Sequence, residues 1–214
     1  MYLPFLPLLT IPVLLPTSFA SVLPRAAETI FSLRVNIDVP SQSTFDFRSQ
    51  DGKYLFAAGG KLYVNGVVTK QPNGELTGWA APPAYMSCAT TGYANTTCAL
   101  QPTRGPQTLY SARDNTISFT SSPDALIPVE ARPAQQWSVD MNNFLKYSLD
   151  GLTLWMSRYA ACPVHSPYGG WQIYTARYGY RWGYTQSCPG GAQASYFNLV
   201  AVPQEPRNRW EVYV

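Results

Sequence analysis

The sequence has few charged residues. Lys, Arg, Asp and Glu make up 13% of its 214 residues, and the formal net charge is +3. Soluble chains usually carry roughly a quarter of such residues. No run of like charges exceeds two residues, so the chain has no basic arm or clustered basic patch of the kind that binds nucleic acid. We therefore expect no nucleic-acid partner.

The sequence also lacks the motifs of common catalytic and metal centres. Its one histidine, His165, lies between Pro163 and Pro167, which predicts a surface loop rather than a catalytic base. There is no Gly-x-Ser-x-Gly elbow, no phosphate-binding loop and no pair of cysteines with C-x-x-C spacing. The sequence thus predicts a protein that is not an enzyme, with no catalytic residue, no metal and no cofactor.

Two alternative functions remain open at this point. A glycan-active hydrolase needs two carboxyl groups roughly 5–10 Å apart. Asp114 and Asp150 are followed by turn-forming residues, which leaves Glu130 and Asp140 as the candidate acids. The other alternative is a secreted effector or antigen that binds a host protein.

After the first twenty residues the chain has no long apolar segment. Residues 1–20 carry no charge, contain the apolar stretch Leu8 to Leu15, and end in Ser18-Phe19-Ala20, which has the form of a cleavage site. A membrane anchor is the alternative, but four prolines interrupt this short segment. We predict a protein that is secreted to the extracellular space or cell wall, without membrane association after cleavage. Its predicted parts are a signal peptide at 1–20, an extended lead-in at 21–42 and an all-β domain at 43–214.

Four cysteines follow the predicted signal peptide, which in a secreted chain predicts two disulfides. Three pairings are possible. We favour Cys88–Cys98 and Cys162–Cys188, because each pair brackets a loop-like stretch between predicted strands. Asn95-Thr96-Thr97 is a glycosylation sequon inside the first of these loops, so we expect Asn95 to be exposed and glycosylated.

The residues that the chain does have in number are aromatic and turn-forming. Aromatics make up 14%, and the chain has 15 Tyr, 6 Trp, 19 Pro and 15 Gly. This composition is typical of short β-strands joined by turns, and no stretch shows helical periodicity over three turns. We predict a single all-β domain of about eleven short strands, a β-trefoil-like barrel in preference to a two-sheet β-sandwich.

The predicted strands follow the turn signals. Three hairpins are centred on Gly59-Gly60, Asp114-Asn115 and Asp150-Gly151, and residues 70–95 are predicted to be loop-like. The predicted strands are 44–48, 53–57, 61–64, 97–100, 108–112, 116–120, 136–139, 144–148, 152–156, 171–174 and 196–202.

The stretch from Gln107 to Thr175 carries short motifs in a characteristic order. They are Gln107-Thr108-Leu109-Tyr110-Ser111, Asn115-Thr116-Ile117-Ser118-Phe119-Thr120, Ile127-Pro128, Ala161-Cys162-Pro163 and Trp171-Gln172-Ile173-Tyr174. This stretch resembles the fungal cell-wall protein phiA family, whose members are secreted and linked to phialide and conidium development. The stretch covers about a third of the chain. The resemblance implies a secreted cell-wall protein without enzymatic chemistry.

The segment richest in aromatic residues runs from Tyr168 to Tyr184. Flat aromatic faces offer apolar contact area with a polar edge, which suits the C–H faces of sugar rings. Arginines in the segment could donate hydrogen bonds to sugar hydroxyls. The alternative is a tyrosine-rich hairpin that packs on itself over Cys188. We predict that wall polysaccharide binds here, through Tyr178, Tyr180, Arg181, Trp182 and Tyr184.

Overall fold

The chain is all-β, as predicted. The computed structural model describes residues 29–65, 69–70, 76–77, 83–91, 95–131, 137–148, 155–156, 158–164, 170–179 and 183–204. These residues form seventeen strands, one short α-helix and two 3-10 turns. None of the helices in these ranges is long and apolar enough to cross a bilayer.

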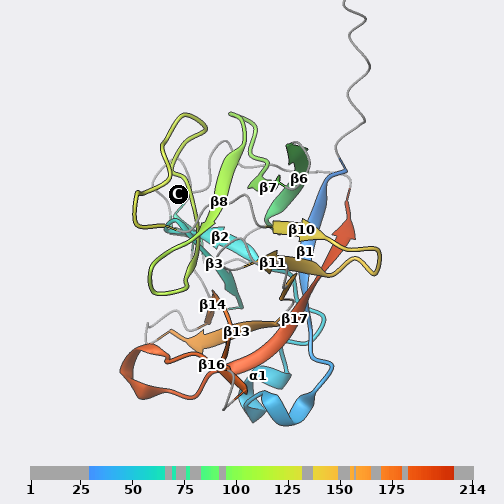
Figure 1. The fold of residues 1–214 in the computed structure, drawn as a ribbon. Helices are drawn as coiled ribbons and strands as arrows, with labels where there is room; N and C mark the ends of the chain where they lie inside the picture. The colour runs from blue at the N-terminus through green and yellow to red at the C-terminus, as the bar shows by residue number, and fades with distance from the viewer. Residues whose placement is uncertain are drawn as a thin grey trace, which may run out of the picture.

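Ten strands form one antiparallel sheet (Figure 1). One additional pairing joins strands from opposite ends of the order of this sheet. The last strand but one in its order, β3, also pairs with the first, β14, through Trp171↔Val64 and Gln172↔Tyr63. The order across the sheet is β14 (Trp171–Thr175), β13 (Arg158–Pro163), β17 (Ser195–Pro203), β1 (Phe31–Asn36), β6 (Tyr85–Thr91), β7 (Asn95–Leu100), β8 (Gln107–Ser111), β9 (Ile117–Phe119), β3 (Lys61–Val64) and β2 (Phe56–Ala58). The β-trefoil arrangement stays a prediction.

The other strands form smaller sheets. A three-stranded sheet packs against β6 and β7 through its first strand, β10. Its strands are β10 (Trp137–Val139), β11 (Leu145–Ser148) and β12 (Trp155–Met156). The two-stranded ribbons are β4 (Thr69–Lys70) with β5 (Leu76–Thr77), and β15 (Arg177–Gly179) with β16 (Gly183–Thr185). The helical elements are η1 (Pro40–Gln42), α1 (Phe45–Arg48) and η2 (Pro189–Gly191).

Part of the predicted lead-in is a strand inside the sheet. β1 pairs along its whole length with β17, from Phe31↔Pro203 to Asn36↔Asn198, and also pairs with β6. In Figure 1 this first strand, in blue, runs beside the last, in red. Leu33 and Val35 of β1 are buried in the core. The folded domain therefore begins before residue 43.

The segment 44–48, predicted as a strand, is one turn of α-helix. Phe47 is fully buried, whereas Phe45 has 83% of its surface exposed. Residues two apart share a face in a strand but not in a helix. The backbone N–H of Thr44 donates to Ser195 Oγ over 2.9 Å, which attaches the start of α1 to β17. The strand prediction was wrong because alternation over five residues fits a helix turn with one buried ring equally well.

The predicted loop at 70–95 contains strands. β6 and β7 are joined by six register pairs, from Met86↔Leu100 to Thr91↔Asn95. Four threonines flank the tip of this hairpin, and β-branched residues favour strands. The prolines and glycines that suggested a loop lie before residue 84, ahead of the strand. The loop prediction was therefore wrong at Tyr85–Thr91 and Asn95, and also at the short strand Leu76–Thr77.

A series of aromatic rings runs through the core. Ring centroids are 5.1 Å apart for Phe47 and Phe197, 6.2 Å for Phe197 and Tyr159, and 5.2 Å for Tyr159 and Tyr147. Trp137 of the three-stranded sheet continues the series, 5.7 Å from Tyr147. The Tyr159 hydroxyl donates to the Leu145 carbonyl, and burial raises the pKa of Tyr159 well above its ordinary value. These rings join α1, the main sheet and the three-stranded sheet in one core.

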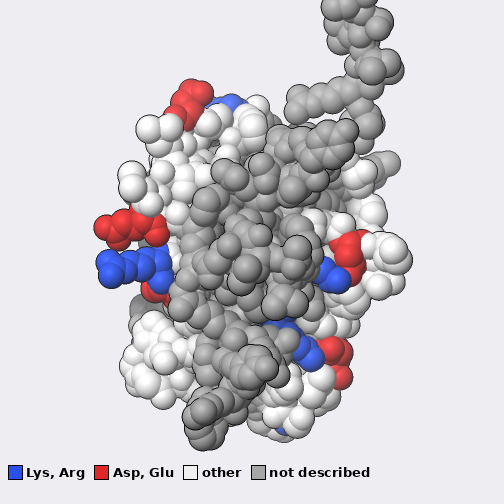
Figure 2. All heavy atoms as spheres, viewed as in Figure 1, with Lys and Arg blue, Asp and Glu red and all other residues white. Residues whose placement is uncertain are grey.

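The charged side chains of the described residues lie in small groups of both signs. The ion pairs are Arg113–Glu130 at 3.8 Å, Lys146–Asp140 at 2.8 Å, and Arg158–Asp38. Figure 2 shows acidic and basic side chains next to each other in several places around one face, with no large patch of a single sign among the described residues.

Candidate functional site

Part of the aromatic segment is a two-stranded ribbon. β15 and β16 pair with Tyr178 opposite Tyr184 and Gly179 opposite Gly183. Residues directly opposite each other share one face of such a pair, so positions 178 and 184 belong to the same face. The other predicted binding residues, Tyr180, Arg181 and Trp182, lie outside the described residues. We call residues 176–188 the aromatic hairpin.

The first end of the aromatic hairpin is fixed to the core at Ala176, which is fully buried. Its N–H donates to the Arg158 carbonyl over 3.4 Å. Its carbonyl accepts a hydrogen bond from the hydroxyl of Tyr147, which also lies 2.7 Å from the Arg158 carbonyl. Because Tyr147 belongs to the buried aromatic series, the ribbon begins on a rigid support.

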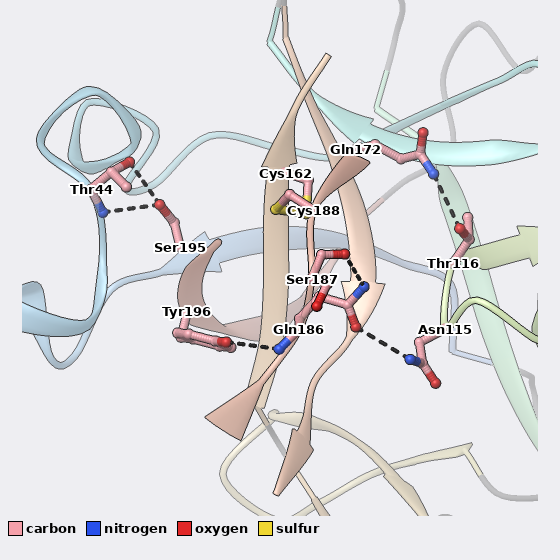
Figure 3. The surroundings of a disulfide bond; sticks show 10 residues. All are labelled: Thr44, Asn115, Thr116, Cys162, Gln172, Gln186, Ser187, Cys188, Ser195 and Tyr196. Carbon is pink, nitrogen blue, oxygen red and sulfur yellow. Dashed lines mark hydrogen bonds between the residues drawn. A yellow bond between two sulfur atoms is a disulfide. The ribbon is translucent and has the colours of Figure 1, made fainter. Parts of the chain in front are cut away.

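The second end is held by hydrogen bonds at Gln186 (Figure 3). The Gln186 N–H donates to the Tyr196 hydroxyl over 3.0 Å. Its side-chain oxygen accepts from Asn115 Nδ2 over 3.3 Å, and its Nε2 donates to the Ser187 carbonyl over 3.2 Å. Gln186 thereby links the ribbon to β17 and to the turn between β8 and β9.

The Cys162–Cys188 disulfide attaches the same end to β13, three residues after β16. The structure has this bond as the sequence predicted, with the two Cα atoms 5.4 Å apart. Both cysteines are buried in a small apolar cluster on the outer side of the sheet, together with Tyr174 and Ala176. Both ends of the aromatic hairpin, Ala176 and Cys188, therefore lie in one apolar cluster, and the disulfide fixes the second of them to β13.

The other predicted disulfide, Cys88–Cys98, is also present. Its two cysteines are register partners in the β6–β7 hairpin, with Cα atoms 4.0 Å apart. The stretch between them is therefore mostly paired strand, and the loop predicted there was wrong. Asn95, predicted as a glycosylated loop residue, opens β7 opposite Thr91 at the tip of this hairpin. Its glycosylation stays a prediction.

The two candidate acids of the hydrolase alternative have different surroundings. The side chain of Glu130 is 75% exposed and forms a long ion pair with Arg113. The side chain of Asp140 is 17% exposed and occupies the turn between β10 and β11. Asp140 Oδ1 accepts from the N–H groups of Asn142 and Phe144, each over 2.9 Å. Asp140 thus has a structural role, and His165 lies outside the described residues.

The surroundings of Asp140 predict a pH-dependent contribution to stability. Burial acts to raise the pKa of this carboxyl, but hydrogen bonds from Lys146, Phe144 and Asn142 and the charge of Lys146 outweigh it and hold the pKa below its ordinary value. A carboxyl with a lowered folded-state pKa stabilises the fold above its unfolded pKa, and this stabilisation is lost as the pH falls through the folded-state pKa. We expect Asp140→Asn to lower the free energy of unfolding by about 1 kcal/mol at neutral pH.

The measurement is urea denaturation of both proteins at neutral pH and near pH 2. The difference should shrink at the lower pH, because the wild-type carboxyl becomes protonated as the pH falls through its folded-state pKa. Asp124→Asn is the matched control, because Asp124 is exposed and should cost nothing at either pH. An equal loss at both pH values would contradict the role of the Asp140 charge.

The chemistry available at the aromatic hairpin is recognition by rings and polar edges. In the part of the chain described, no group of three or more His, Cys, Asp or Glu side chains could hold a metal ion. The residues that position the hairpin, such as Gln186 and Tyr196, were not predicted from the sequence. No protein-family model, curated protein or solved structure matches this chain.

Proposed function

We propose that this chain is a secreted, non-enzymatic, cell-wall-associated protein that binds wall polysaccharide through the aromatic hairpin. The observation that carries the proposal is the attachment of both hairpin ends. Ala176 is held by buried backbone and tyrosine contacts, and Cys188 by a disulfide to β13. A ribbon fixed in this way loses little conformational entropy when a ligand binds.

The residue types of the hairpin support a sugar ligand. Its sequence from 177 to 185 holds four aromatic residues and two arginines. Aromatic faces give large contact areas at low entropic cost, while the phenol and guanidinium groups can bond hydroxyls. The small net charge of +3 gives little long-range attraction for a strongly acidic polymer.

Secretion and wall association rest on separate observations. Two disulfides are typical of proteins that fold in an oxidising compartment. The uncharged segment 1–20 has the composition of a signal peptide, and the stretch from Gln107 to Thr175 resembles the phiA family. We also propose that the main sheet closes as a barrel, which the pairing of β14 with both β13 and β3 supports.

The test is retention of the purified chain on insoluble chitin and β-glucan. We expect the wild type to be retained. A Tyr180→Ala/Trp182→Ala variant should bind with an apparent affinity that is weaker by a factor of about ten or more, because two ring contacts are removed. Tyr54→Ala is the control, because Tyr54 is a partly exposed tyrosine that pairs with Arg34 of β1. Equal passage of wild type and variant through every polysaccharide would refute the proposal.

A further inference from the structure

A polar and aromatic cluster lies where three strands meet beside the aromatic hairpin. β14 pairs with β3 at Gln172↔Tyr63, and two residues later Tyr174 pairs with Thr116, just before β9. Ile173, between these two β14 positions, is buried in the main core. Because side chains alternate along a strand, Gln172 and Tyr174 belong to the opposite, outer face. We call Tyr63, Asp114, Thr116, Gln172 and Tyr174 the strand-junction cluster.

A chain of hydrogen bonds fixes the polar groups of this cluster. Gln172 Nε2 donates to Thr116 Oγ1 over 3.2 Å, as Figure 3 shows. The Thr116 hydroxyl in turn donates to Asp114 Oδ2 over 2.8 Å, and the Thr116 N–H donates to Asp114 Oδ1 over 3.0 Å. The Asp114 carboxylate is therefore held in one orientation at an exposed turn, with acceptor capacity left for a ligand hydroxyl.

Tyr63 is the partly exposed ring of the cluster. Its hydroxyl makes no hydrogen bond within the described residues, and burial raises its pKa, so that it remains a neutral donor. Tyr174 is buried beside it, with a side-chain hydrogen bond to Thr116, and burial raises its pKa too. Tyr63 thus presents ring surface and an uncharged hydroxyl opposite Gln172, which is linked through Thr116 to the Asp114 carboxylate.

The strand-junction cluster is continuous with the base of the aromatic hairpin. Tyr174 packs in the apolar cluster that contains Ala176 and Cys188, the two ends of the hairpin. Asn115, between Asp114 and Thr116, donates to Gln186 at the second end. The cluster and the hairpin therefore share their supporting residues.

We propose that the strand-junction cluster is a second subsite for the same polysaccharide, which takes an uncharged pyranose ring against Tyr63, with hydroxyls bonded to Asp114 and the Tyr63 phenol. This inference rests on the proposed function. A flat ring beside fixed hydrogen-bonding groups suits a sugar, whose C–H face is apolar and whose rim carries hydroxyls. The negative charge of Asp114 disfavours acidic polymers, so the ligand class is neutral glucan or chitin-type chains.

The experiment measures binding of laminarihexaose and chitohexaose to the full chain by calorimetry. We expect Tyr63→Leu to raise the Kd about tenfold, because leucine keeps apolar bulk but removes the flat ring and the phenol. Tyr63→Phe should cost about threefold, through loss of the hydroxyl alone. Tyr54→Leu, at another partly exposed tyrosine, should leave the Kd unchanged.

Asp114→Asn is the second variant, because asparagine keeps an acceptor for the Thr116 N–H and is compatible with the turn. It should raise the Kd about fivefold, since hydrogen bonds to a charged acceptor are roughly twice as strong. If Tyr63→Leu does not fold, Asp114→Asn and Tyr63→Phe decide the outcome.

Each result is informative. If the wild type binds neither hexaose at millimolar concentration, both the proposed function and the subsite are overturned. If the wild type binds and the Tyr63 and Asp114 variants bind equally well, the subsite alone is overturned. Losses at Tyr63 and Asp114, with no effect at Tyr54, support it.

Discussion

Replacing Phe47 with alanine is expected to lower the free energy of unfolding by about 3–5 kcal/mol, the usual range for loss of a buried phenylalanine. Phe47 is fully buried, and its ring centroid lies 5.0 Å from that of Trp171 and 5.1 Å from that of Phe197. Removing the ring leaves a cavity between α1, β14 and β17, and the one-turn helix has no other buried residue to hold it. Urea denaturation followed by tryptophan fluorescence measures the loss.

The chain supplies a matched control two residues away. Phe45 belongs to the same helix turn and is 83% exposed, so Phe45→Ala should change the free energy of unfolding by less than about 0.5 kcal/mol. The slope of unfolding against denaturant should be the same for both variants, because neither changes how much surface unfolding exposes. Comparable losses at the two positions would mean that both rings face the core, as in a strand.

The Phe45–Phe47 pair also shows where sequence reasoning reached its limit. Two phenylalanines at i and i+2 fit a half-buried strand, and nothing local distinguishes that from a helix turn. The distinction comes from Trp171 and Phe197, which are more than a hundred residues away and receive only one of the two rings. The conformation of a residue that packs against such distant partners cannot be predicted from the residues next to it in the sequence.

Turns were predicted well because their chemistry is local. The Asp51-Gly52 turn has Gly52 at φ 75°, and the Asp114-Asn115 turn has Asn115 at φ 70°. Glycine and asparagine tolerate this left-handed region, so the residue type by itself indicates the turn. β8 and β9, which flank the second of these turns, and β3, which follows the Gly59-Gly60 turn, were predicted for the same reason.

Strands held by distant partners were harder to predict. β1 was expected to be a lead-in outside the domain, but it is paired along its length with the last strand of the chain. β6 (Tyr85–Thr91) was expected to be part of a loop, because the stretch that leads into it contains Pro72-Asn73-Gly74 and Pro82-Pro83. Both strands gain stability from ladders whose partners are set by the whole fold, which a local pattern does not contain.

For the candidate site, the sequence suggested which residue types to examine but did not indicate which residues support them. The even number of cysteines, and the predicted loops between them, led to the prediction of both disulfides. The bonds that fix the aromatic hairpin join Gln186 to Asn115, 71 residues away, and to Tyr196. Glutamine, asparagine and tyrosine are common surface residues, so no signal in the sequence marked these three. The same holds for Tyr63, which only the pairing of β3 with β14 brings to the hairpin.

Removing the Cys162–Cys188 disulfide is expected to let the aromatic hairpin open locally, whereas removing Cys88–Cys98 is not. The chain-entropy relation gives about 3.5 kcal/mol for Cys162→Ala/Cys188→Ala and about 2.7 kcal/mol for Cys88→Ala/Cys98→Ala, because the bonds close stretches of 26 and 10 residues. These losses are similar in size. The two bonds differ in what they hold in the folded state, and local opening reports that difference.

Trypsin provides the measurement, because Arg177 and Arg181 are cleavage sites within the aromatic hairpin. Without the Cys162–Cys188 bond, one end of the hairpin is held by the hydrogen bonds of Gln186 alone, so we expect cleavage at these arginines to accelerate about tenfold or more under native conditions. The Cys88–Cys98 variant keeps six register pairs between β6 and β7, and its hairpin at 176–188 should be cleaved at the wild-type rate. Mass spectrometry of early fragments identifies the cut sites. Equal acceleration in both variants would show that the disulfides act only through global stability, and the fixed hairpin on which the proposed polysaccharide site depends would lose its main support.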